Sequence, residues 1–352
     1  MAVPALARDV RALRPRRHTD PIRLSSNENP LGMPEASRRA VLDALAIGNR
    51  YPQRRDELQA AVAARHGVGA EVVLGNGSTE VLQMVVQAMG PGARLVLPDP
   101  TFEHVEQYAR PFGIDIVKVP LRPDGSHDLD GMRAAARGGD ASLVFVCNPN
   151  NPTGTLTSCD DVESWIRAAD ERTWFLVDEA YFEYVEAPGY RSFIALALSR
   201  PGVVVSRTFS KVYGLAGLRV GYALAEPRTA TRIEQFTLNT NINQLGIAAA
   251  LAALEEPAFV GRSVQMNRDS RDLAVATLRE LEIPHLPTHA NFLMHRIRSD
   301  LRGYIAAMAE RGIRVGRPFP PMLDHNRVSF GLPEEMQAWA AALRELRAGG
   351  LV

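Results

Sequence analysis

Short apolar runs alternate with longer amphipathic stretches along most of the chain. Six apolar runs of strand length fall at residues 71–74, 94–97, 115–119, 142–147, 174–177 and 203–207. Helical patterns lie between them, for example at 56–66, 78–89, 160–169 and 229–235. Alternating strands and helices are typical of α/β architecture, and nearly unbroken apolar strands are typical of a parallel sheet covered on both faces. The pattern predicts an α/β fold with a mostly parallel central sheet.

The pattern changes after about residue 245. An Ala-rich helix leads into Arg-rich sequence that is broken by prolines, with further strands predicted at 291–295 and 327–330. A chain of 352 residues is long for one compact core. We therefore predict a large domain at 35–245 and a smaller α+β domain built from residues 1–34 and 246–352.

Charge and cysteine content narrow the function classes. Lys plus Arg and Asp plus Glu both number 40, so no overall charge attracts nucleic acid or an anionic membrane. No apolar stretch is long enough to span a bilayer, and the first residues lack the apolar core of a secretory signal. Only Cys147 and Cys159 are present, which does not make a disulfide framework. We expect a cytoplasmic protein that binds neither nucleic acid nor membrane.

Turns rich in Gly, Pro or polar residues follow five of the predicted strands. In doubly wound sheets, ligands sit beyond the carboxyl ends of the strands. These turns are therefore expected to converge on one crevice. Their sequences are LGNGSTE, LPDPTFE, CNPNNPTG, VDEAY and SRTFSK.

Lys211 and Asp178 have the character of a cofactor-binding pair. Lys211 stands among apolar and small residues, where a desolvated ammonium has a lowered pKa and becomes nucleophilic toward aldehydes. Asp178 ends an apolar strand, and its carboxylate can keep a ring nitrogen protonated. Pyridoxal 5′-phosphate needs both a lysine and such an acid. We predict that Lys211 binds this cofactor as a Schiff base, although a solvated lysine and a helix-capping aspartate are the plainer alternatives.

The remaining cofactor ligands are predicted from the same turns. The GNGSTE segment opens a helix, whose free N–H groups and dipole suit a phosphate. Phe102 is expected to stack on the pyridine ring, unless it is simply a core aromatic. The candidate phosphate ligands are Gly77, Ser78, Thr79, Thr208, Ser210 and Arg219.

Taken together, these segments resemble the fold-type I pyridoxal-phosphate-dependent aminotransferases, and most of all their histidinol-phosphate aminotransferase branch. The matching segments span nearly the whole chain in the family's order. They are LSSNENPLG (24–32), RYP (50–52), GNGSTE (75–80), DPTFEHV (99–105), CNPNNPTG (147–154), VDEAY (177–181), RTFSKVYGLAGLRVGY (207–222) and NRVSFG (326–331).

The resemblance implies further cofactor contacts. Asn151 would hydrogen-bond the 3′-oxygen of the cofactor, and the peptide bond into Pro152 is cis in relatives. Tyr181 would contact the same oxygen and help to set the pKa of the Schiff base. Tyr51 would reach across a homodimer interface to the phosphate in the partner subunit.

The resemblance also implies the reaction and the substrate contacts. An amino group would move from histidinol phosphate, or from an aromatic or related amino acid, to a 2-oxo acid, with Lys211 as general base and no metal. Arg327 would hold an acidic group of the substrate, with Arg317 as a second arginine and Asn29 as a further substrate contact. Ordinary surface positions are the alternative for both arginines.

One segment departs from the family. Relatives in this branch carry a tyrosine in the N-terminal segment that covers the substrate, whereas this chain reads RPRRHTDPIRLSS there and has no tyrosine before Tyr51. Arg16, Arg17 and His18 stand in its place. Because fold and cofactor do not fix the reaction, a pyridoxal-phosphate-dependent oxidase or decarboxylase stays open as an alternative. A ligand-sensing regulator is disfavoured, because too few residues precede 24–32 to form a DNA-binding domain.

Overall fold

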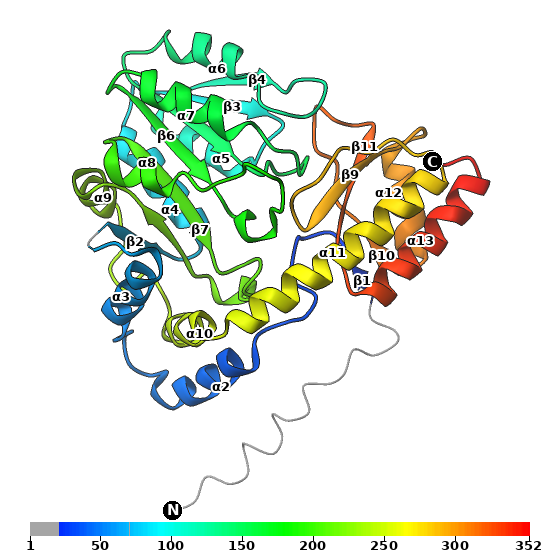
Figure 1. The fold of residues 1–352 in the computed structure, drawn as a ribbon, viewed down its shortest axis with the longest axis horizontal. Coiled ribbons are helices and arrows are strands. Elements are labelled where there is room, and N and C mark those ends of the chain that lie inside the picture. Colours follow the sequence, from blue (N-terminus) through cyan, green and yellow to red (C-terminus); the bar gives the residue numbers. More distant parts are fainter. Residues whose placement is uncertain (1–20, 70) are drawn as a thin grey trace, which may run out of the picture.

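The computed structural model describes residues 21–69 and 71–352. These residues contain a seven-stranded sheet in the order β2-β8-β7-β6-β5-β3-β4 (Figure 1). Only β8 runs antiparallel to its neighbours, and the other pairs are parallel. The strands are β2 (Val72–Gly75), β3 (Arg94–Asp99), β4 (Asp115–Pro120), β5 (Ser142–Cys147), β6 (Thr173–Asp178), β7 (Val203–Thr208) and β8 (Gly221–Leu224).

Helices cover both faces of this sheet. On β5, Leu143 and Phe145 pack toward one face, and Val144 and Val146 pack toward the other. Both faces are fully apolar there, which explains why the strand reads as an unbroken hydrophobic run. The first face is covered by α4 (Ser78–Met89), α5 (His104–Ala109) and α9 (Pro227–Glu234), and the second by α6 (Leu129–Ala136), α7 (Cys159–Ala168) and α8 (Ile194–Ser199).

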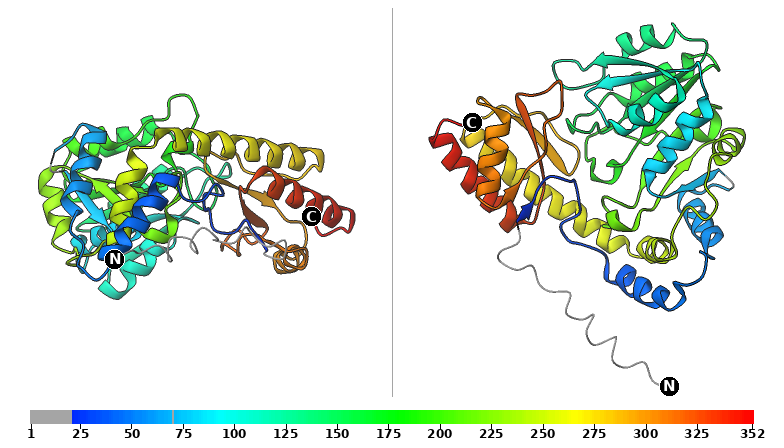
Figure 2. Two further views of the ribbon diagram at one scale, coloured as in Figure 1. Left: turned by 90° about the horizontal axis from the view of Figure 1, so that it is seen from below. Right: turned by 180° about the vertical axis from the view of Figure 1, so that it is seen from behind.

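A second, smaller body lies beside the sheet, and the 24-residue helix α11 (Pro257–Glu280) runs between the two (Figure 2). Its core surrounds the buried Trp339 and Tyr304. The N-terminal β1 (Ile22–Arg23) pairs with β10 (Ile313–Arg314), which brings the start of the described chain to this body. Its other elements are β9 (Phe292–Arg296), α12 (Leu301–Glu310), β11 (His325–Ser329) and α13 (Pro333–Ala348).

The remaining helices lie at the β2 side of the large body. They are α2 (Glu35–Ala44), α3 (Arg55–His66) and α10 (Gln244–Leu254), and α10 packs on both α2 and α3. Most of α10 lies after residue 245, yet the helix packs against α2 and α3 of the large body. The predicted domain boundary at 245 therefore rests on the sequence pattern alone and stays a prediction. Across the described ranges, no helix combines the length and the apolar character needed to cross a membrane.

The sequence patterns match most strands of the structure, with three omissions. All six strands predicted in the large body are present, as are strands near 291–295 and 327–330. The predicted helices correspond to α3, α4, α7 and α9. Strand β8 was not predicted, because its first two residues lie inside the RTFSKVYGLAGLRVGY segment and read there as part of a binding motif. The two-residue strands β1 and β10 were also not predicted.

A buried ion pair holds the carboxyl ends of β6 and β7 together. Arg207 on β7 lies 2.6 Å from Glu179, directly after β6, and both side chains are almost fully buried. Glu179 also accepts a hydrogen bond from the backbone N–H of Phe193 at 2.7 Å. Since a buried carboxylate is tolerated only when it is paired, these contacts hold the turn after β6 in one arrangement. Asp178 is the residue immediately before that turn.

Candidate active site

The carboxyl ends of the parallel strands open into a cavity of about 740 Å³ between the two bodies. Turns from the large body line one wall, and residues 315–319 and Arg327 of the smaller body line the other. The expected convergence of the strand-end turns is therefore observed. The predicted residues that line the cavity are Ser78, Thr79, Phe102, Asn151, Asp178, Tyr181, Thr208, Ser210, Lys211, Arg219, Arg317 and Arg327.

Lys211 lies at the floor of the cavity. Its Nζ donates a hydrogen bond to the backbone oxygen of Asn27 at 3.3 Å and sits 5.5 Å from the centroid of the Tyr181 ring. Burial, reinforced by the positive charge of Arg327, lowers the pKa of the Lys211 amine to about 8. The lowered pKa increases the neutral fraction of the amine near neutral pH, and the neutral amine is the form that attacks an aldehyde.

Asp178 ends β6 on the same side of the sheet. The hydroxyl of Ser206, its register partner on β7, donates a hydrogen bond to its Oδ1 at 2.7 Å. Burial raises the pKa of the Asp178 carboxyl to about 6, against the effect of the Ser206 hydrogen bond. A cation placed beside this group would offset its desolvation and restore its charge.

A set of donors suited to a phosphate lies at the N-terminus of α4. Arg219 donates through Nη2 to the Thr79 hydroxyl at 3.1 Å and through Nη1 to the Ser210 hydroxyl at 3.3 Å. Gly77 has φ 75°, and a Cβ atom there would stand 2.3 Å from Nη2 of Arg219. Glycine is thus required for the guanidinium to approach the helix N-terminus, where free N–H groups face an anion.

The remaining predicted contacts surround the space between these groups. Phe102 stacks on His104, with ring centroids 4.7 Å apart and planes inclined by 25°. The peptide bond between Asn151 and Pro152 is cis, as the resemblance implied. Tyr181 accepts a hydrogen bond from Nδ2 of Asn27 at 3.0 Å, and burial raises the pKa of its hydroxyl. An amine, an acid, a stacking ring and a phosphate cradle thus meet in one cavity, and they fit pyridoxal 5′-phosphate.

Arg327 and Arg317 stand at the end of the cavity away from α4. Arg327 is buried and donates to Oδ1 of Asn151 and to the backbone oxygen of Ser25, each at 2.7 Å. Within residues 21–69 and 71–352, its Nε has no hydrogen-bond partner. Burial lowers the pKa of Arg327 to about 10, so it remains a cation. Arg317 is half exposed and forms an ion pair with Glu103 at 2.7 Å.

Two predicted residues and one segment lie elsewhere. Asn29 does not line the cavity, because its Nδ2 donates to the backbone oxygen of Val212 and to the Ser263 hydroxyl, both at 2.9 Å. Tyr51 is 81% exposed on the outer surface of the large body. Arg16, Arg17 and His18 lie outside the described residues.

Sequence reasoning missed Asn27, which lies in the quoted LSSNENPLG segment. Its backbone is left-handed, with φ 53°, and its N–H donates to the Ser329 hydroxyl at 2.9 Å. This arrangement brings its carbonyl to Lys211 and its side chain to Tyr181. Only the position of Asn27 beside Asn29 in a recognised segment hinted at such a role.

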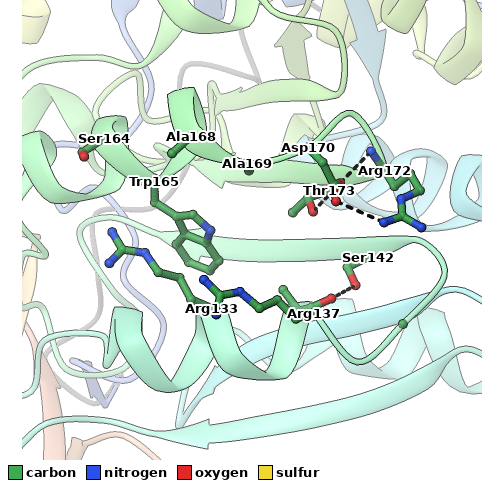
Figure 3. Close-up of a pocket in the computed structure, with 12 residues that line it drawn as sticks. Arg133, Arg137, Ser142, Ser164, Trp165, Ala168, Ala169, Asp170, Arg172 and Thr173 are labelled. Atoms are coloured by element: carbon green, nitrogen blue, oxygen red, sulfur yellow. Dashed lines mark hydrogen bonds and ion pairs between the residues drawn. The ribbon is translucent and has the colours of Figure 1, made fainter.

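A second cavity, of about 550 Å³, lies between α6 and α7 at the opposite ends of β5 and β6 (Figure 3). Its arginines are largely neutralised, since Arg133 pairs with Asp130 at 3.1 Å and Arg172 with Asp170 at 3.3 Å. Among the described residues its lining contains no lysine. The chemistry predicted from the sequence belongs to the first cavity.

Comparison with known proteins agrees with this site. Residues 19–343 match the family Aminotransferase class I and II, and the chain belongs to this family. The protein is therefore an aminotransferase, with pyridoxal 5′-phosphate as its cofactor and a fold-type I architecture, as predicted.

The chain is similar to several histidinol-phosphate aminotransferases. It is 37% identical to a histidinol-phosphate aminotransferase of Moorella thermoacetica over 94% of this chain and 86% of that protein. It is 38% identical to histidinol-phosphate aminotransferase 2 of Ralstonia nicotianae, over 92% and 87% of the two chains. The crystal structure of the Sinorhizobium meliloti histidinol-phosphate aminotransferase in complex with pyridoxal-5′-phosphate is 28% identical, with a TM-score of 0.87 and coverage of 93% and 91%.

Because the Asp178 carboxyl is buried, we predict that the free energy of unfolding of the cofactor-free protein depends on pH. Its pKa is higher in the folded chain than in the unfolded chain, so folding favours the protonated form. The free energy of unfolding should fall as pH rises from about 4 to about 6, and stay lower above that range. Asp178→Asn should remove this fall and stabilise the cofactor-free protein at pH 8 by up to about 3 kcal/mol.

Urea unfolding of the cofactor-free protein between pH 4 and pH 8 measures this effect. The exposed Asp140→Asn is the matched control and should behave like the parent chain. Equal stability of Asp178→Asn and the parent protein at pH 8 would show that the carboxyl is not desolvated.

Proposed function

We propose that the amino donor is histidinol phosphate and that the acceptor is a 2-oxo acid. The observation that carries this proposal is the pair of guanidinium groups at the far end of the cavity. Arg327 is a buried cation that, among the described residues, forms no ion pair with a carboxylate. A phosphate monoester offers up to two negative charges and several acceptor oxygens, which suit two arginines better than one carboxylate does. The relatives named above carry the same activity in their names.

The cofactor-binding residues take the following roles in this proposal. When bound, pyridoxal 5′-phosphate supplies an aldehyde for a Schiff base with Lys211 and a ring that accepts electrons. Asp178 would hold a proton on the ring nitrogen, and Asn151 and Tyr181 would contact the 3′-oxygen. Phe102 would stack on the ring. The phosphate ligands are Gly77, Ser78, Thr79, Thr208, Ser210 and Arg219.

Lys211 moves the proton in the reaction. Once the donor amine has replaced it, Lys211 is a free amine whose pKa near 8 suits proton transfer around neutral pH. It would take the proton from the donor carbon that bears the amino group and hold it for return to the bound molecule. Arg327 and Arg317 fix the anionic end of the donor, so that this carbon faces Lys211.

We also propose that the protein works as a homodimer. Tyr51 stands exposed beside other exposed apolar residues, and the Arg55–Glu234 contact at 3.7 Å ties the segment after Tyr51 to the end of α9. A face of this kind favours association, and Tyr51 would reach the cofactor phosphate of the partner subunit. The apolar residues on this side are Leu45, Ile47, Phe236 and Leu238.

We also propose a location and a domain division. The free thiols of Cys147 and Cys159 agree with a reducing compartment, and we place the protein in the cytoplasm. We place the domain boundaries at residues 34 and 245, where the sequence pattern changes. Asn29 is not included among the substrate contacts, because its amide donates to Val212 and Ser263.

Donor preference tests the proposed reaction. Histidinol phosphate should convert the bound aldehyde form to pyridoxamine phosphate, and Arg327→Gln should lower kcat/KM for this donor by about 10- to 100-fold, the effect of losing a charged hydrogen bond. Stopped-flow absorbance of the cofactor measures the conversion. The exposed Arg298→Gln is the control. If phenylalanine reacts as well as histidinol phosphate and Arg327→Gln changes neither, the donor is not histidinol phosphate.

The role of Tyr51 predicts a defect in cofactor binding. Tyr51→Phe should release cofactor about 5- to 10-fold more readily, because one hydrogen bond to a charged phosphate is lost. Dialysis followed by absorbance measures retained cofactor, and sedimentation velocity measures the oligomeric state. The control is Phe112→Leu, which changes another exposed aromatic residue. Tyr304→Phe would not serve, because Tyr304 is buried in the core of the smaller body. A monomeric holoenzyme with full activity would contradict the shared-site arrangement.

A further inference from the structure

Two arginines share one aromatic ring at the substrate end of the cavity. The Cζ atoms of Arg317 and Arg327 lie 4.2 Å and 4.6 Å from the centroid of the Phe319 ring. Their backbones are also tied together, because the N–H of Gly316 donates to the carbonyl of Arg327 at 2.8 Å. A Cβ atom on Gly316 would stand 2.5 Å from that carbonyl oxygen, so glycine permits the close approach.

The two guanidinium groups differ in their partners. Arg327 contacts neutral oxygens, of Asn151 and Ser25. Arg317 instead faces Glu103, with 2.7 Å between Nη2 and Oε1. Glu103 comes from the turn after β3 on the opposite wall, and both members of this ion pair line the cavity. An anionic donor that binds both arginines must therefore break the ion pair between Arg317 and Glu103.

We propose that Glu103 competes with the donor's phosphate for Arg317 and so sets the affinity of the cavity for phosphate groups. This inference rests on the proposed function, because it assumes a phosphate-bearing donor. Glu103 lowers the affinity of the cavity for any small anion. A donor that also binds through its amino group and ring offsets this loss, whereas a free anion has no such contacts. The carboxylate thus weakens both ligands by the same factor, but only the whole donor has further contacts that hold it in the cavity.

The position of Arg317 does not depend on Glu103. Arg317 donates through Nη1 to the carbonyl of Pro318 at 2.8 Å, and it stacks on Phe319. These contacts keep the guanidinium in the cavity when the carboxylate is removed. The ion pair itself is about half exposed, with side-chain exposures of 51% and 44%. Exposed pairs of this kind change an equilibrium constant by up to about fivefold, which sets the size of the expected effect.

Glu103→Gln tests the competition, since it keeps the shape of the side chain and removes its charge. In the holoenzyme, KM for histidinol phosphate should fall about three- to fivefold while kcat changes by less than about twofold. KM for histidinol, which lacks the phosphate, should stay the same. The matched control is Glu280→Gln, which removes a similarly exposed partner of Arg344 at 2.7 Å on the smaller body.

A second readout does not need turnover. The dissociation constant of inorganic phosphate, measured by calorimetry on the holoenzyme, should fall by the same factor in Glu103→Gln and rise in Arg317→Gln. If the parent enzyme does not convert histidinol phosphate, the proposed donor is wrong, and phosphate binding still decides the role of Glu103. An unchanged or weaker affinity for phosphate in Glu103→Gln would overturn the competition, and a weaker one would show that Glu103 positions Arg317.

Discussion

The partial desolvation of Lys211 is the constraint on which the rest of the site depends. The amine is surrounded by the strand ends of the large body, by Asn27 of the N-terminal segment and by Arg327 of the smaller body. Burial lowers the pKa of Lys211 and raises that of Asp178, so the charged form of each group is destabilised in the cavity. A cofactor with a protonated ring nitrogen and an aldehyde satisfies both at once.

The sheet supplies the rigidity that this arrangement needs. Asp178 and Ser206 are register partners on the neighbouring strands β6 and β7, and their hydrogen bond follows directly from that pairing. One residue further on, the buried pair of Glu179 and Arg207 holds the same two strands together. Asp178, which would contact the ring nitrogen, is therefore held on two firmly paired strands. Functional groups that need precise placement are usually built on such rigid elements.

Sequence reasoning reached the fold and the cofactor half of the site because both rest on local patterns. Strand periodicity and the turns after the strands located Asp178, Lys211, Arg219 and the α4 N-terminus. It failed where the contact joins distant segments. Asn27 is held by Ser329, 302 residues away, and Glu103 meets Arg317 from the opposite wall. Asn29 shows the converse error, because a polar residue in a recognised segment has its amide engaged by Val212 and Ser263.

The most direct test of this account is the identity of the lysine that binds the cofactor. The holoenzyme is reduced with borohydride, which turns a Schiff base into a stable secondary amine, and then digested and analysed by mass spectrometry. The account predicts that the added mass of the reduced cofactor appears on the peptide containing Lys211, and that Lys211→Ala retains no reducible cofactor. Labelling of Lys118, which pairs with Glu106 at 2.8 Å outside this cavity, or an unlabelled Lys211 peptide, would contradict it.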